Sequence, residues 1–363
     1  MGKLLFTPGP TNVPTEIREV LGQDLIHHRM GDYQSILGEV KHGLKAIFNT
    51  EQDVIILSSS GTGSMESAIV NLFSPLDEVL VINTGAFGKR FIEICEVYGI
   101  CVHELKYEWG ETYQINDVET CLKEYPQIKG IFVTYHETAT GVVNDLKQLG
   151  ELTKETERLL ITDCISGMVV QEFHFDDWGI DCAVASSQKG FLLPPGISFV
   201  ALSCKATKAI EESKLPKYYW DYRKYLQRLE PPFTPAIGIV VALRKALETL
   251  LSVGLSQVIA TKIELREYTQ EKFKELGFSL FIADDTLRGN VMVPVVAPSD
   301  VDIQKLVTIL DERYDLTVSN GMGSYAYEML RIGIIGEITK DDIDLLINRI
   351  KEILPECRKD LVK

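Results

Sequence analysis

The segment CAVASSQKGFLLPPG (residues 182–196) places one lysine, Lys189, between an apolar run and an apolar loop. The run CAVA is typical of a buried strand, and the loop FLLPPG is nearly as apolar. A buried ammonium group without a partner is costly, and burial lowers its pKa. Lys189 is therefore either a surface lysine whose stem lies along apolar groups, or an amine kept partly neutral as a nucleophile.

The sequence around this segment alternates strand-like apolar runs with helical patterns. Three such runs are EVLVINTG (78–85), GIFVTYHET (130–138) and RLLITD (158–163), and helical spacing lies between them. Continuous apolar strands that alternate with helices are typical of a mainly parallel sheet between helices, which predicts an α/β fold. In such folds ligands bind beyond the carboxyl ends of the strands, so the polar residues there are the candidates for a site.

The length of 363 residues favours two domains. The alternation of strands and helices changes after a long helical pattern at about 236–252. We expect an extended N-terminal arm at 1–14, because its prolines and glycine oppose regular structure. A large domain at 15–253 and a smaller C-terminal α/β domain at 254–363 complete the predicted organisation.

The composition excludes several classes of partner. A formal net charge of −15 argues against nucleic acid and anionic membrane surfaces, which need a positive footprint. Seven cysteines without a CxxC pair indicate reduced thiols in a reducing compartment. No apolar run approaches membrane-spanning length and the N-terminus does not resemble a signal peptide, so we expect a cytoplasmic protein.

The segment SSSGTGSMES (58–67) joins an apolar run to a helical pattern. Ser60, Gly61 and Thr62 lie at the turn, where glycine permits close approach and the start of a helix offers free N–H groups. Such a turn is suited to a phosphate group. The alternative interpretation is an ordinary strand-to-helix turn with a Ser or Thr cap.

Asp163 follows the buried run RLLIT directly. A carboxylate at this place could cap a helix, form an ion pair, bind a metal or hold a cationic ring nitrogen. A metal site needs several clustered ligands, and the sequence has no HxxxH or HExxH pattern, so we predict no metal.

The phosphate turn, Asp163 and Lys189 together match the groups of pyridoxal phosphate. This cofactor has a phosphate, a ring nitrogen that must stay protonated and an aldehyde that forms a Schiff base with lysine. The three features occur in this order on an alternating α/β chain, which favours one shared cofactor site over three unrelated explanations.

The chain resembles the class-V aminotransferases of the pyridoxal phosphate fold-type-I superfamily, in the alanine–glyoxylate and serine–pyruvate branch. The resemblance extends over nearly the full length, and the whole set of segments is specific although no single one is. These segments are FTPGPTNVP (6–14), SSGTGSMESAIVNL (59–72), HETATGVVNDL (136–146), ITDCISG (161–167), DDWGIDCAVASSQKGFLLPPG (176–196), FTPAIGIVVALRKAL (233–247) and LRIGIIGEIT (330–339).

The resemblance implies a role for each matching residue. Lys189 would form the Schiff base and move the proton during catalysis, and Asp163 would hold the pyridine nitrogen. Arg331 would bind the substrate carboxylate, although a structural salt bridge is the alternative. The remaining implied cofactor contacts are Ser60, Gly61, Thr62 and Gln188 to the phosphate, Ile165 and Phe87 to the faces of the ring, Thr138 near cofactor and substrate, and Thr234 to the phosphate of a neighbouring subunit.

Some of these roles keep a plain alternative. Phe87 could be core packing and Thr138 could cap a turn. The role of Thr234 implies a homodimer with shared active sites. The chain departs from the family pattern at Pro231, where relatives can carry a tyrosine, and at Met30, where they carry a small hydroxyl residue. For this reason we assign no chemical role to the neighbouring His28 or Arg29.

By this resemblance the chain would transfer an amino group from a small amino acid, alanine or serine, to an oxo acid, glyoxylate or pyruvate, by double displacement. The main alternative is a 2-aminoethylphosphonate–pyruvate aminotransferase, for which Arg29 and Lys89 are the only nearby extra cations. A cysteine desulfurase-like enzyme would need a reactive late cysteine, such as Cys204 or Cys357. A non-catalytic pyridoxal phosphate-binding protein is a further alternative, against which the intact Lys189 argues.

Overall fold

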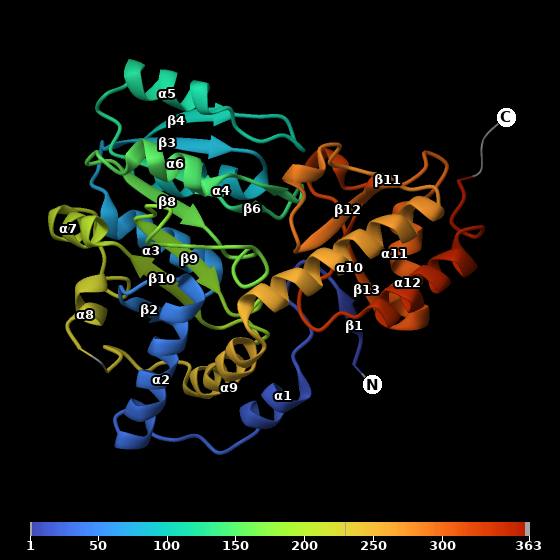
Figure 1. Cartoon of the computed structure of the whole chain (residues 1–363), viewed down its shortest axis with the longest axis horizontal. Coiled ribbons are helices and arrows are strands. Elements are labelled where there is room, and N and C mark those ends of the chain that lie inside the picture. The colour runs from blue at the N-terminus through green and yellow to red at the C-terminus, as the bar shows by residue number, and fades with distance from the viewer. Residues whose placement is uncertain (1, 229, 360–363) are drawn as a thin grey trace.

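The computed structural model describes residues 2–228 and 230–359 (Figure 1). Within them, the larger sheet has seven strands, and β10 runs antiparallel to both of its neighbours while the other neighbouring pairs are parallel. This sheet confirms the predicted α/β fold. Its spatial order is β2 (Val54–Leu57), β10 (Ser198–Leu202), β9 (Cys182–Ser186), β8 (Leu159–Asp163), β5 (Gly130–Thr134), β3 (Glu78–Asn83) and β4 (Cys101–Lys106).

Helices cover both faces of this sheet, which explains why its central strands read as continuous apolar runs. Successive residues alternate between two cores, so Leu160 packs on one face and Ile161 on the other. The first face is covered by α1 (Thr15–Leu21), α2 (Gly31–Phe48), α5 (Ile115–Glu124), α6 (Leu146–Thr153) and α9 (Ile237–Val253), and the second by α3 (Gly61–Leu72), α4 (Ala86–Val97), α7 (Cys204–Glu212) and α8 (Tyr222–Leu226).

A second, five-stranded sheet is built mainly from the C-terminal part of the chain. Its order is β1 (Leu4–Phe6), β13 (Leu316–Asn320), β14 (Met329–Gly333), β12 (Met292–Val296) and β11 (Ser279–Leu280). Three helices pack on this sheet: α10 (Leu255–Glu275), α11 (Ile303–Tyr314) and α12 (Lys340–Ile353). The remaining described elements are a small hairpin, β6 (His136–Glu137) and β7 (Val142–Val143), and two short 3₁₀ helices, η1 (Asp285–Leu287) and η2 (Gly323–Tyr325).

The N-terminal arm is more regular than the sequence indicates. β1 pairs in parallel with β13, so Leu4 lies opposite Leu316. The irregular part begins only after Phe6, where prolines remove backbone donors. The predicted boundary at residue 253 coincides with the junction of α9 and α10, and the division into domains itself stays a prediction.

Helix α10 connects the two sheets and crosses from α9 toward β12 (Figure 1). Its Lys262 is buried and donates hydrogen bonds to the carbonyl oxygens of Ile334, at 2.9 Å, and Gly336, at 2.6 Å. Burial lowers the pKa of Lys262 to about 8. The contact fixes the loop that follows β14, the strand that carries Arg331.

The cysteines form no disulfide in the part of the chain that the structure describes; Cys101 and Cys204 are exposed and the other five are buried. The localisation in the cytoplasm stays a prediction. Among residues 2–228 and 230–359, no helix has both the length and the apolar character needed to cross a membrane.

Candidate active site

The segments that follow β8 and β9 meet at the carboxyl edge of the seven-stranded sheet. These strands are parallel neighbours. β8 ends at Asp163, and β9 ends shortly before Lys189. The two segments pack so closely that a side-chain carbon at Gly190 would overlap the carbonyl oxygen of Met168. The structure therefore places Asp163 and Lys189 at one site, as the strand pattern predicts.

Lys189 is half-buried, and its amine donates a hydrogen bond to the carbonyl oxygen of Pro8 at 2.7 Å. The N-terminal arm thus lies over the lysine, and a side-chain carbon at Gly9 would overlap the amine. Burial lowers the pKa of Lys189 to about 8, while the negative charge of Asp163 opposes this shift and the positive charge of Arg331 adds to it. A lysine with this pKa has a far larger neutral fraction near pH 7 than an ordinary lysine, and a nucleophile or a proton acceptor needs the neutral form.

Asp163 is a buried carboxylate with one oxygen committed. Its Oδ1 accepts a hydrogen bond from the backbone N–H of Ile165 at 2.8 Å. Burial raises the pKa of Asp163 to about 6, against the opposing effects of that N–H and of the positive charges of Arg90 and Lys189. Oδ2 makes no hydrogen bond within the described residues, so it is available to a cationic partner such as a protonated ring nitrogen.

The predicted phosphate turn forms the start of α3. Ser60 is the N-cap residue, and its side chain makes no capping hydrogen bond. Gly63 and Ser64 donate their N–H groups to the carbonyl oxygen of Ser60, whereas those of Gly61 and Thr62 have no acceptor in the described chain. Two free N–H groups at the positive end of a helix can bind a phosphate.

Gly61 is required by its neighbour across the site. A side-chain carbon at this position would lie 2.5 Å from Cδ1 of Ile165. Ile165 is half-buried and follows Asp163 by two residues, so it approaches the turn from the aspartate side. The phosphate turn, the isoleucine and the carboxylate therefore line one site, and their chemistry fits pyridoxal phosphate.

Phe87 lies at the start of α4, where a buried glutamate fixes the backbone. Oε2 of Glu137 accepts the N–H groups of Phe87 at 3.0 Å and Gly88 at 3.2 Å. The guanidinium of Arg90, one turn further, lies 4.7 Å from the centre of the Phe87 ring and donates to the Thr62 hydroxyl at 3.2 Å. Phe87 is half-buried rather than part of the core, and Arg90 brings a positive charge to the phosphate turn.

Arg331 lies on β14 and is tied to the main part of the site through Thr138. Its Nε donates to the carbonyl oxygen of Asn320 at 2.7 Å, and its Nη1 donates to that of Thr138 at 3.0 Å. No carboxylate pairs with it among the described residues, so the alternative of a structural salt bridge receives no support. Nη2 makes no hydrogen bond there either, which leaves a donor for an anionic group.

Two predicted residues lie at the margin of these contacts. Gln188 accepts a hydrogen bond from the Ser186 hydroxyl and makes none to the phosphate turn among the described residues. Thr234 is exposed. Its segment is anchored near the turn, because the N–H of Ala236 donates to the Ser58 hydroxyl at 3.1 Å.

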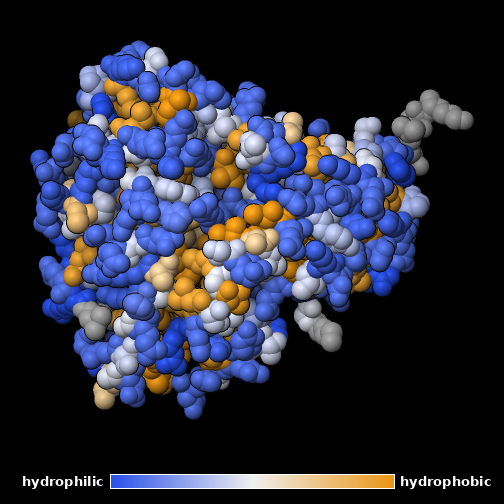
Figure 2. All heavy atoms as spheres, in the orientation of Figure 1, coloured by the Kyte–Doolittle hydropathy of each residue, from blue (hydrophilic) through white to orange (hydrophobic). Residues whose placement is uncertain are grey.

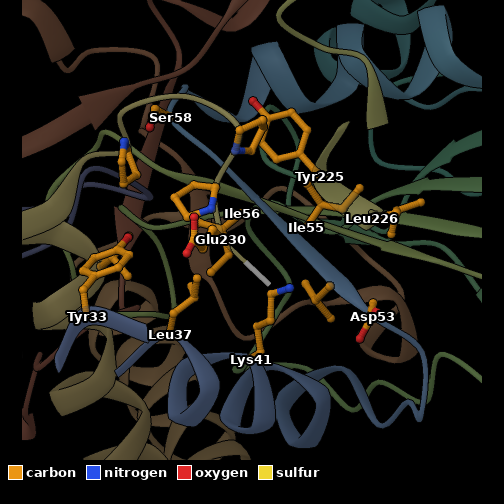
Figure 3. A pocket seen from close by; sticks show the side chains of 15 residues that line it. Tyr33, Leu37, Lys41, Asp53, Ile55, Ile56, Ser58, Tyr225, Leu226 and Glu230 are labelled. Atoms are coloured by element: carbon orange, nitrogen blue, oxygen red, sulfur yellow. The ribbon is translucent and has the colours of Figure 1, made fainter. Parts of the chain in front are cut away.

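A separate pocket lies between α2, β2 and the segment that carries Thr234. Figure 3 shows Leu37 and Lys41 pointing into it from α2, with Glu230 on the opposite side. None of the predicted site residues lines it.

Arg29 and Lys89, the two extra cations considered for the alternative substrate, both have acidic partners. Arg29 forms an ion pair with Glu230 at 3.2 Å, and the exposed Lys89 pairs with Glu93 at 3.5 Å. Both candidate extra cations are thus paired with nearby acids.

Sequence reasoning missed several groups at the site. The carbonyl of Pro8 is a backbone group, which has no sequence signal. The only signal for Arg90 is its spacing of three residues from Phe87, which places both on one side of a helix. His136 and Ser166 are buried beside Thr138. Their place in the segments HETATG and DCISG was the only available signal.

The family model that describes class-V aminotransferases matches residues 7–346. A relative from Synechococcus sp., whose name is soluble hydrogenase, small subunit, is 33% identical and covers 97% of this chain and 93% of its own length. The L-aspartate–glyoxylate aminotransferase of Paracoccus denitrificans is 32% identical over 92% of this chain and 87% of its own. Among solved structures, the alanine–glyoxylate aminotransferase of Nostoc sp. superimposes with a TM-score of 0.94 at 27% identity, covering 98% of this chain and 96% of that one.

We predict that Lys189 of the cofactor-free protein becomes reactive at lower pH than an ordinary lysine. Reductive methylation with formaldehyde, read by peptide mass at each pH, should give a midpoint at about 8 for Lys189. In Asp163→Asn the midpoint should move to lower pH, because the lost carboxylate favours the ammonium form. A wild-type midpoint near the ordinary lysine value, or a shift to higher pH in the variant, would contradict the assignment of this pair.

Proposed function

The chain belongs to the class-V aminotransferases, and from that membership we propose that it uses pyridoxal phosphate to move an amino group from a small α-amino acid to an oxo acid. The proposed donor is alanine or serine, and the proposed acceptor is glyoxylate or pyruvate. The names of the Nostoc and Paracoccus relatives support glyoxylate as an acceptor for the family members that carry them.

One observation carries the proposal. Asp163 and Lys189 lie on the two segments that pack together after β8 and β9, and Arg331 donates to the carbonyl oxygen of Thr138. An amine, a buried carboxylate and a guanidinium are the groups that a cofactor aldehyde, a ring nitrogen and a substrate carboxylate would require.

Pyridoxal phosphate, when bound, supplies an aldehyde that takes up the amino group and a ring that draws electrons from the substrate Cα. The N–H groups of Gly61 and Thr62, with Arg90, would hold its phosphate, and Oδ2 of Asp163 would hold its ring nitrogen. Ile165 and Phe87 would lie against the ring. The Nζ of Lys189 would accept a proton from the substrate Cα and return it, a role that suits its lowered pKa.

Arg331 would bind the carboxylate of donor and acceptor alike. Nε and Nη1 are held by carbonyl oxygens, which fixes the plane of the guanidinium. Nη2 then approaches the substrate with a defined direction, so the arginine would orient the reacting carbon as well as bind the anion.

The competing functions receive less support. Arg29 and Lys89, the extra cations considered for an aminoethylphosphonate substrate, are held in ion pairs with Glu230 and Glu93. A desulfurase-like cysteine would have to reach Lys189. Cys204 follows β10, whose last residue pairs with the first residue of β9, so it lies at the opposite edge of the sheet from Lys189.

We also propose a homodimer that shares its active sites, through Thr234. This residue is exposed although its segment contacts Ser58, two positions before the phosphate turn. Figure 2 shows apolar side chains gathered over α9 and the beginning of α10, where Leu251 and Val253 are exposed. A second subunit that covers such groups would be stabilised by their burial.

Borohydride reduction of the cofactor-loaded protein should place the pyridoxyl mass on Lys189. A panel of amino donors, each tested with glyoxylate and pyruvate, should show turnover with alanine or serine and release of the matching oxo acid. Aspartate and aminoethylphosphonate belong in the panel as competitors. Label on another lysine would sink the site assignment, and much faster turnover of aminoethylphosphonate would establish the alternative function.

Arg331→Lys should lose about ten- to a hundredfold in kcat/KM for both the amino acid and the oxo acid. The lysine keeps the positive charge but loses the planar donor, and a hydrogen bond to a charged group is worth about 1.5–3 kcal/mol. The two losses should be similar, because one residue serves both substrates. A loss confined to one of them would show that a second group binds the other carboxylate.

The dimer prediction is tested with Thr234→Ala. Sedimentation should show a dimer for both the wild type and the variant. The variant should bind pyridoxal phosphate more weakly than the wild type does. The exposed hydroxyl of Thr207, on α7, provides a matched substitution that should leave that affinity unchanged. A fully active wild-type monomer would contradict the shared site.

A further inference from the structure

Three buried polar side chains form a chain of hydrogen bonds beside the site. The hydroxyl of Thr138 donates to Oγ of Ser166 at 2.7 Å. That oxygen lies 3.1 Å from the carbonyl oxygen of His136 and 3.1 Å from Nδ1 of the same residue. These hydrogen bonds connect Thr138, which is proposed to contact the cofactor, with His136, which has no role in the proposed reaction so far.

Counting protons indicates which ring nitrogen of His136 carries the hydrogen. Ser166 has one hydroxyl proton, and it donates this proton to the carbonyl oxygen of His136. The contact with Nδ1 then requires that Nδ1 be the donor, because Ser166 Oγ has only lone pairs left. Nε2, which has no partner among the described residues, is then a bare acceptor rather than an orphaned N–H. An unmatched lone pair is the less costly of the two.

The surroundings of the ring keep it neutral and in place. His136 is fully buried, and burial together with the positive charge of Lys189 lowers its pKa to about 3. Gly289 approaches the ring so closely that a side-chain carbon there would overlap it, and Val143 borders the same space. The imidazole is therefore neutral at pH 7, and its outer edge packs against the backbone of Gly289.

The same short segment also anchors Arg331. The carbonyl oxygen of Thr138 accepts from its Nη1 at 3.0 Å, while the Thr138 hydroxyl belongs to the chain of hydrogen bonds. The position of Thr138 therefore determines the positions of both its own hydroxyl and the Arg331 guanidinium, and the proposed reaction uses both groups.

We propose that His136 is a positioning residue whose Nδ1–H sets the direction of this chain, so that the Thr138 hydroxyl can donate its proton to an anionic oxygen in the site. The inference deepens the proposed function and rests on it, because the cofactor or substrate would supply that oxygen. In the structure Thr138 donates to Ser166, and Ser166 donates to the His136 carbonyl. If the two hydroxyls rotate, Ser166 donates to Thr138 and Thr138 donates into the site. His136 Nδ1–H still donates to Ser166, and no proton changes atoms.

The first test uses cofactor-free protein with ¹⁵N in its histidine rings. The sequence has six histidines, and the signal lost in His136→Asn identifies the one in question. We expect a neutral ring with the proton on Nδ1 throughout about pH 5 to 8. A proton on Nε2, or protonation of the ring in that range, would overturn the proposal without any reference to the reaction.

The second test compares two variants of equal shape. His136→Asn puts an amide donor near the place of Nδ1, whereas His136→Leu has the same number of side-chain heavy atoms and no donor. Both variants lose the outer part of the ring, so their melting temperatures should fall by similar amounts. The dissociation constant for pyridoxal phosphate should rise about tenfold or more in His136→Leu and stay within about threefold of the wild type in His136→Asn.

Equal affinity of the two variants would overturn the proposal. If His136→Leu does not fold, the tautomer measured in the wild type still decides it. A wild-type protein that binds no pyridoxal phosphate would instead refute the proposed function, and the ring tautomer would remain measurable in that protein.

Discussion

The close approach of the segments after β8 and β9 is the constraint on which the site depends. Parallel pairing of these strands places both segments at one edge, and Gly190 lets the second lie directly against the carbonyl of Met168. Val169 and Leu192, one on each segment, adopt positive φ angles of 78° and 61°. Such conformations are costly for residues with side chains and persist where the surrounding structure enforces them.

This packing buries Asp163 and shields part of Lys189 from water. Burial disfavours the charged form of each, so their pKa values move toward one another, to about 6 and about 8, while their mutual attraction limits the shift. Near pH 7 the amine is therefore neutral in part, while the carboxylate is still mostly ionised. That is a suitable state for an amine that must be nucleophilic and a carboxylate that must remain ionised.

The strand pattern predicts the fold class and part of the site, whereas the other site residues are predicted only by the resemblance to the family. Asp163, Lys189 and the turn at Ser60 each follow an apolar run, and parallel strands bring such positions to one edge. The same reasoning could not find β1, since its partner β13 is remote in sequence and its three residues carry no period. It could not find the Pro8 carbonyl, which any residue could provide, or the orientation of His136, which depends on packing against Gly289.

The pairing of β1 with β13 has a consequence for the order in which the enzyme is made. The ribosome releases Leu4 early, but its partner Leu316 emerges only after nearly the whole chain has been synthesised. The larger sheet can form before that moment, whereas the arm whose Pro8 carbonyl binds the Lys189 amine has no strand to pair with. Such long-range pairing is formed late in folding. During translation Lys189 therefore remains without this cover until β13 has been synthesised.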